Sequence, residues 1–172
     1  MHTLKKFIHY YGPYKAVFFL DLICATIISL IDLAYPQILR TCTNTLFTKS
    51  SSSILSALLP IAAGLLIMYL IQSLCKYYVS YQGHVMGAKI EYDMRAEIFA
   101  HFQKLSFSFY DDQKVGQLMS RITTDLFDIT ELMHHGPENI ILSLIKIIGA
   151  FVILMSIKPA LALAAFAVLP FM

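Results

Sequence analysis

Three charged side chains inside long apolar stretches are the residues of this sequence most able to do chemistry. Asp21 and Asp32 interrupt one apolar stretch, and Lys146 interrupts another. The two aspartates are eleven residues apart, about three helical turns, so both point the same way from a helix. Charges inside membrane segments usually face a bundle interior or a water-filled cavity. We expect the three to line a substrate cavity, where Lys146 meets an anionic group or the aspartates meet a cation. A Lys146–aspartate ion pair that joins two helices is the alternative.

Metal and disulfide chemistry are not expected from the spacing of the cysteines and histidines. The cysteines lie far apart and without metal-binding spacing, at Cys24, Cys42 and Cys75. Four histidines lie in or beside the polar middle of the chain: His84, His101, His134 and His135. A metal site needs ligands that converge, and surface or interfacial histidines are far more common. We therefore predict no metal site.

Nucleic-acid binding and nucleotide hydrolysis are also not indicated. The formal net charge is only +2, and no basic cluster is interleaved with aromatic residues. A phosphate-binding loop of the form G-x-x-x-x-G-K-[ST] is absent, and none of the seven glycines is followed by lysine. We expect these 172 residues to hold no ATP site, to need no cofactor and not to be an enzyme by themselves.

The elements that position the charged residues are long apolar helices. The chain is 58% hydrophobic and 14% charged, with a mean hydropathy of +0.66, whereas a soluble domain is about a quarter charged. A membrane span needs about 20 apolar residues, which predicts spans at 16–39, 54–82 and 138–157. The apolar stretch at 160–172 is too short to cross, so we interpret it as the start of a fourth span and the sequence as a fragment.

Residues 83–137 between the second and third predicted spans form a helical hairpin. Apolar residues recur there at helical spacing, first at Ile90, Met94, Ile98, Phe102, Leu105 and Phe109, and then at Leu118, Ile122, Leu126, Ile129 and Leu132. Its first helix would be about 40 Å long, against about 30 Å for the bilayer hydrocarbon. Lysine and arginine gather on this hairpin and at the amino terminus, which favours a cytoplasmic arm and a cytoplasmic amino terminus.

The amino-terminal residues 2–14 have the pattern of a helix on the membrane surface. Apolar side chains fall on one face, at Leu4, Phe7, Ile8 and Tyr11. Such a helix lies in the headgroup layer before the chain turns at Gly12–Pro13 into the first span. No cleavable signal sequence is apparent.

The polar middle of the chain resembles the first intracellular loop of ABC-type exporters. Residues 94–111, MRAEIFAHFQKLSFSFYD, are similar to the family pattern LRxxLFxHLQxLSFSFFD, and residues 116–125, GQLMSRITTD, are similar to GxLxSRITND. The resemblance implies an all-α, polytopic membrane helix bundle with long cytoplasmic helical extensions. It makes 2–14 the elbow helix, and 83–137 the loop whose coupling helix, at about 106–115, docks on a nucleotide-binding domain.

The resemblance also implies roles for individual residues. The coupling residues would be Ser106, Phe107, Phe109, Tyr110, Asp111, Asp112, Val115 and Gly116. Arg121 and Asp125 would lie at the root of the returning helix, where their four-residue spacing also permits a local ion pair.

The full-length protein implied is an ATP-hydrolysing translocase of the multidrug or lipid exporter type in a bacterial plasma membrane. Its partners would be membrane lipid, a nucleotide-binding domain that uses ATP and Mg²⁺, and a second transmembrane domain in a homo- or heterodimer. The alternative is a truncated or regulatory membrane protein whose helical arm binds a cytoplasmic partner without transport.

Overall fold

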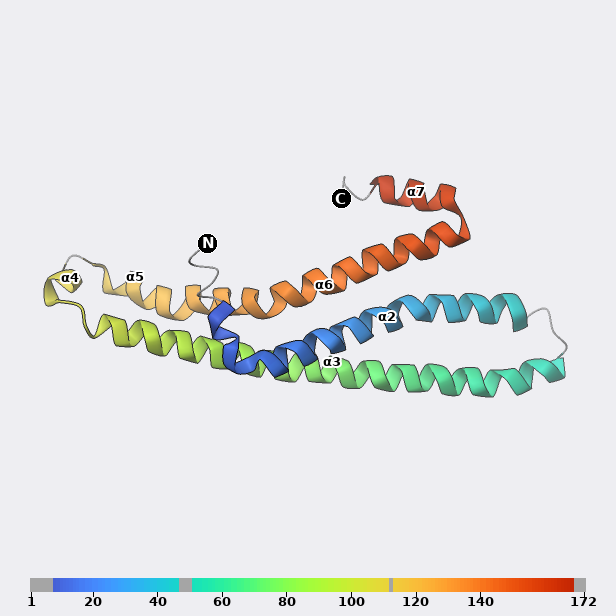
Figure 1. Cartoon of the computed structure of the whole chain (residues 1–172), viewed down its shortest axis with the longest axis horizontal. Helices are drawn as coiled ribbons and strands as arrows, with labels where there is room; N and C mark the ends of the chain where they lie inside the picture. Colours follow the sequence, from blue (N-terminus) through green and yellow to red (C-terminus); the bar gives the residue numbers. More distant parts are fainter. Residues whose placement is uncertain (1–7, 47–50, 112, 169–172) are drawn as a thin grey trace. The chain divides into compact units, whose positions relative to one another are not determined.

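The computed structural model describes residues 8–46, 51–111 and 113–168 of the chain (Figure 1). Throughout these ranges the regular structure is helical, without a strand. Three helical stretches are long and apolar enough to cross a membrane: Gly12–Asn44, Leu58–Phe102 and Val115–Ile157. The predicted all-α membrane fold is confirmed.

The helices follow one another with short connections. In chain order they are the 3₁₀-helix η1 (Gly12–Tyr14), α2 (Lys15–Leu46), α3 (Ser51–Phe102), α4 (Phe107–Asp111), α5 (Val115–Ser120), the π-helix η2 (Arg121–Asp125), α6 (Leu126–Ile157) and α7 (Pro159–Val168). The spans expected at 16–39, 54–82 and 138–157 fall within α2, α3 and α6. Of the expected elbow, residues 8–10 are helical and 2–7 lie outside the described residues. Of the expected fourth span, α7 is described and 169–172 are not.

The chain divides into two compact units. The first, here called the arm unit, contains residues 1–22 and 78–139, and the second, the span unit, contains residues 23–77 and 140–172. Each of α2, α3 and α6 contributes one part to each unit.

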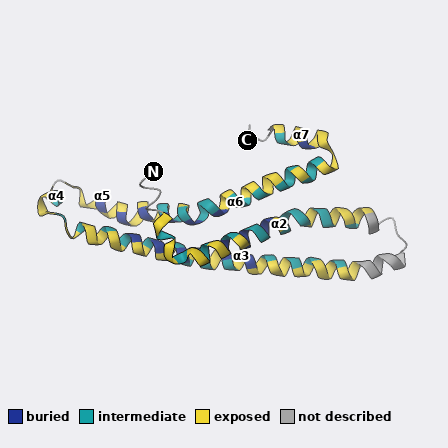
Figure 2. Ribbon diagram, in the orientation of Figure 1, coloured by how far each residue is buried: buried dark blue, intermediate teal, exposed yellow. Residues whose placement is uncertain are grey.

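The core of the arm unit is a stripe of apolar side chains at helical spacing. Met86, Ile90 and Met94 lie on one face of α3 and pack with Leu126 of α6. Met86 and Ile90 are each only 2% exposed, and removing such side chains from water is the main stabilising contribution to helix pairing. Figure 2 shows buried positions, in dark blue, between exposed ones along α3.

Three tyrosines attach the amino-terminal segment to this core. The hydroxyl of Tyr14 donates a hydrogen bond to Oδ2 of Asp93 over 3.1 Å, and that of Tyr10 donates one to Oε2 of Glu97. Burial, followed by the hydrogen bond to Glu97, raises the pKa of Tyr10 to about 12, so this hydroxyl keeps its proton at neutral pH. The rings pack against the cluster of Met86, Ile90, Met94 and Leu126.

The third tyrosine compensates for a proline inside α6. Pro137 lacks the N–H that would otherwise bond to the carbonyl four residues earlier in the helix, and that carbonyl belongs to Met133. The Tyr11 hydroxyl donates a hydrogen bond to the Met133 oxygen. The acceptor left by Pro137 therefore becomes the attachment point of the amino-terminal segment.

The span unit packs closely at a small residue of α6 and leaves large apolar side chains outside. A Cβ added at Gly149 would overlap the side chain of Leu33, so this glycine lets α2 approach α6. Much of the apolar surface is exposed, including Leu66 and Leu74 of α3 and Val152 of α6. Exposed apolar helix faces are what a lipid environment requires.

Candidate functional site

The tip of the arm is the five-residue helix α4, which has one exposed and two partly buried aromatic side chains. Phe107 is 91% exposed. Tyr110 is half-buried, and its hydroxyl donates a hydrogen bond over 2.6 Å to the carbonyl oxygen of Phe102. Phe102 ends α3, and its carbonyl oxygen also accepts the backbone N–H of Leu105 over 3.0 Å. The Tyr110 hydrogen bond thus fixes α4 to the end of α3.

The structure divides the expected coupling segment at 106–115 into two pieces. Helix α4 ends at Asp111, and α5 begins at Val115 after an extended Lys114. The exposed members of the predicted set are Ser106, Phe107, Asp111, Val115 and Gly116. Phe109 and Tyr110 are partly covered, with their rings 5.4 Å apart, edge to face. Asp112 lies outside the described residues.

An apolar groove of about 540 Å³ lies behind this tip. Its walls come from the end of α3, from α4 and from α5 with η2, and include Tyr92, Phe99, Tyr110, Leu118 and Met119. Met119 is 55% exposed. The groove gives the arm unit an apolar face, to which Tyr110 of α4 contributes.

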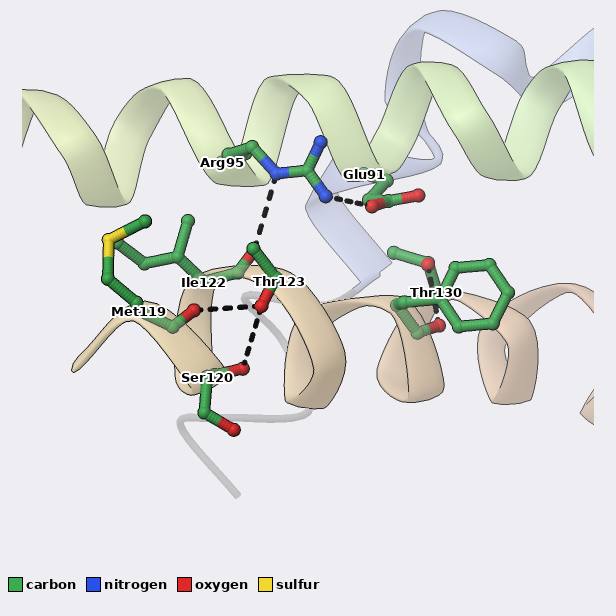
Figure 3. A network of polar contacts seen from close by, with 8 residues as sticks. Glu91, Arg95, Met119, Ser120, Ile122, Thr123 and Thr130 are labelled. Atoms are coloured by element: carbon green, nitrogen blue, oxygen red, sulfur yellow. Dashed lines mark hydrogen bonds and ion pairs between the residues drawn. The ribbon is translucent and has the colours of Figure 1, made fainter. Parts of the chain in front are cut away.

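The two sides of the arm are joined where the returning helix widens into the π-helix η2. Arg95 of α3 donates from Nε to the carbonyl oxygen of Ile122 over 3.3 Å, and its Nη2 pairs with Glu91 (Figure 3). Thr123 bonds back to the carbonyl of Met119 over 2.9 Å. Because a π turn shifts the backbone hydrogen-bond register, an added side-chain donor stabilises it.

The predicted root residues Arg121 and Asp125 both lie on η2 and are exposed. In the described part of the chain no ion pair joins them. The reason is local, since residues four apart are aligned on an α-helix but not on the wider π turn. Arg95, which matches the arginine of the family pattern but was not among the predicted site residues, makes the contact across the arm instead.

Two of the predicted cavity residues meet in the span unit. Lys146 Nζ lies 2.8 Å from Oδ2 of Asp32, and Nε2 of Gln72 donates to Oδ1 of the same carboxylate over 2.6 Å. The ion pair considered as an alternative is therefore present, and it joins α2 to α6. Both charged side chains keep more than a third of their surface exposed, so the pair remains reachable. Gln72 was missed, because a single glutamine in an apolar helix carries no distinctive spacing.

Asp21 has different neighbours, within the arm unit. It is buried beside His134 and Glu138 of α6, and one ligand-type atom from each of the three lies within 4.8 Å of the others. The rings of His84 and His135 flank His134, with centroids 5.4 Å and 4.5 Å from it. We predicted no metal site because no convergence of ligands was apparent, but in the structure these three metal-ligating side chains lie together. The sequence feature that could have indicated this cluster is the four-residue spacing of His134 and Glu138, which puts both side chains on one face of a helix.

Comparison with known proteins agrees with this architecture. The profile of the family described as ABC transporter transmembrane region matches residues 18–172. The uncharacterized ABC transporter ATP-binding protein YwjA of Bacillus subtilis is 41% identical over 167 residues, covering 97% of this chain and 28% of the relative. YgaD of the same species, provisionally named a multidrug export ATP-binding/permease protein, is 27% identical over 173 residues, covering 99% of this chain and 30% of the relative. The chain thus spans less than a third of the length of these relatives, and it belongs to the family of ABC transporter transmembrane regions.

Proposed function

We propose that this chain is the membrane-spanning portion of an ATP-driven exporter, and that α4 transmits the movement of a nucleotide-binding domain to the spans. The observation that carries the proposal is the exposure of Phe107 at the end of the arm. A large aromatic side chain held in water at a loop tip is a typical anchor for a protein partner.

The tip has the rigidity that such a contact needs. Tyr110 is hydrogen-bonded to the end of α3, so a force on Phe107 passes to a long helix and not to a mobile loop. Arg95 links α3 to η2 through Ile122, so both sides of the arm move together. Without this link, a partner that moves one side of the arm could slide α3 past η2, and the movement would not be passed on.

The polar cluster of Asp32, Gln72 and Lys146 is our candidate for the substrate pathway in the span unit. An anionic group entering the pathway would compete with Asp32 for Lys146, whereas a cationic group would compete with Lys146 for Asp32. Either exchange keeps a charge paired, which lowers the cost of moving an ion through an apolar region.

The other parts of the transporter would be supplied by other segments of the same protein or by other chains. We propose a nucleotide-binding domain in the same or a partner chain that uses ATP and Mg²⁺, a second transmembrane domain, and a bacterial plasma membrane with the amino terminus in the cytoplasm. The printed names of the relatives, which include ATP-binding and multidrug export, support this proposal.

Transport measured per ATP hydrolysed tests the coupling role. In the full-length transporter in liposomes, Phe107→Ala should lower that ratio several-fold while ATP hydrolysis and membrane insertion persist. Phe127→Ala is the matched control, since Phe127 is also an exposed phenylalanine of the arm unit, away from the tip. An unchanged ratio in Phe107→Ala would exclude α4 as the coupling element.

A further inference from the structure

We propose that Asp21, His134 and Glu138 form a binding site for a divalent transition-metal ion of the zinc type, with His135 as the fourth ligand. The site joins α2 to α6 inside the arm unit. It is independent of the coupling role proposed for the tip, because none of its residues belongs to α4 or to the groove behind it.

The first argument is the convergence of metal-ligating atoms from separate helices. Asp21 comes from α2, while His134 and Glu138 lie one turn apart on α6. One nitrogen or carboxylate oxygen from each lies within 4.8 Å of the other two. Three ligands around zinc at about 2.0–2.2 Å lie about 3.4 Å apart, so small side-chain rotations bring these atoms to coordinating distance.

The second argument is that these groups are buried and that three of their atoms lack a hydrogen bond. Asp21 is 1% exposed, His134 4% and Glu138 9%. In the described part of the chain, three atoms of this group have no hydrogen bond, namely Asp21 Oδ1, His134 Nδ1 and Glu138 Oε2. Buried polar atoms are nearly always satisfied, so three unsatisfied atoms on side chains that lie together indicate a missing occupant. A cation with several coordination positions satisfies all three at once.

The third argument is that α3 is shaped to admit the His134 ring. A Cβ on Gly83 would overlap the imidazole of His134, so only glycine at this position lets the ring lie against the helix. On the more exposed side, Nδ1 of His135 lies 3.5 Å from Glu138 Oε2. His84 stands next to both histidines, with ring centroids 5.4 Å from each.

The chemistry of the donors selects the class of metal. Two imidazole nitrogens and two carboxylate oxygens suit zinc, and also cobalt as its spectroscopic substitute. Mg²⁺ and Ca²⁺ prefer sites built of oxygen alone. A bound ion would connect α2 to α6 and stabilise the arm unit.

Cobalt titration tests the site directly. The full chain, purified in lipid nanodiscs and stripped with a chelator, is titrated with Co²⁺, and binding is followed by visible absorption and by displacement with Zn²⁺. The expected result is one saturable site per chain with tetrahedral-type absorption. Asp21→Asn and Glu138→Gln keep the side-chain volumes and should each weaken binding by at least about tenfold.

The control variant is His101→Gln, which removes an exposed histidine outside the proposed site and should bind as the parent does. Zn²⁺ should also raise the unfolding temperature of the parent and of His101→Gln, but not that of Asp21→Asn. Folding of each variant is checked by its unfolding temperature without metal. Two results would overturn the proposal in favour of carboxyl groups that share a proton. One is no saturable binding by a folded parent, and the other is an affinity in Asp21→Asn and Glu138→Gln equal to that of the parent.

Discussion

The Tyr11 hydroxyl donates its hydrogen bond to the Met133 carbonyl, the acceptor that Pro137 cannot satisfy within α6. A residue near the start of the chain and one more than a hundred positions later are thereby fixed to each other. The proline that interrupts the backbone hydrogen bonds of α6 also creates the site to which the amino-terminal segment attaches.

Tyr11→Phe should destabilise the arm unit by about 1–3 kcal/mol, because the Met133 carbonyl would lose its donor in a partly buried position. Reversible unfolding in mixed micelles measures this change. Tyr92→Phe removes a hydroxyl from an exposed tyrosine of α3 and should leave stability unchanged. Equal stability of Tyr11→Phe and the parent would mean that the hydrogen bond contributes nothing.

Gly83→Ala and Gly87→Ala form a matched pair on the same helix. The added methyl at Gly83 would overlap the His134 ring, whereas at Gly87 it would meet only the Cβ of His134 at an ordinary 3.9 Å. Overpacking should cost Gly83→Ala about 1–3 kcal/mol, while Gly87→Ala should be neutral or gain up to about 1 kcal/mol from its helix propensity. Thermal unfolding measures both variants, and equal stability of the two would show that α3 and α6 are not packed at Gly83.

Arg95→Met should loosen η2 without unfolding the arm. The substitution keeps much of the side-chain length but removes the donor to the Ile122 carbonyl and leaves Glu91 without its cation. Amide hydrogen exchange should rise at residues 121–126, by a factor equivalent to about 1–2 kcal/mol of lost protection. Arg121→Met, at an exposed position of η2, serves as the control. Unaltered exchange in Arg95→Met would show that η2 needs no support from α3.

The Asp32–Lys146 pair should behave as a coupled unit in a double-mutant cycle. Asp32→Asn or Lys146→Met alone leaves one charge without its partner, and the double variant removes both. We expect a coupling energy of about 0.5–3 kcal/mol between the two sites. Transport per folded molecule then separates the roles, since a pair that only joins helices leaves transport normal in the double variant, while a pathway role lowers it.

The membrane fold was predictable from the sequence because lipid imposes a simple rule. Apolar stretches of about 20 residues are long enough to span the bilayer as helices, and a helix satisfies its backbone hydrogen bonds within its own segment where water is absent. The hairpin between the second and third spans was predictable for a related reason, because its apolar residues recur every three or four positions. Residues 94–111 then carried the family resemblance.

The contacts between distant residues could not be predicted from spacing. Gln72, Arg95 and Tyr11 each act through a partner on another helix, and nothing in their own neighbourhood identifies that partner. The π turn at 121–125 could not be predicted from spacing either, and it removes the alignment that a four-residue spacing gives Arg121 and Asp125 on an α-helix. The cluster around His134 depends on Gly83, whose small size matters only once α3 and α6 are packed together.

Photocrosslinking from position 107 tests the central claim most directly. In the full-length transporter in its native membrane, a photoreactive phenylalanine analogue replaces Phe107, and a second preparation carries it at Phe127. We predict that the probe at 107 crosslinks to a nucleotide-binding domain, with a yield that changes when ATP is added, and that the probe at 127 does not. Crosslinks from position 107 to lipid alone, or to no protein, would contradict the proposal that α4 receives the movement of the motor.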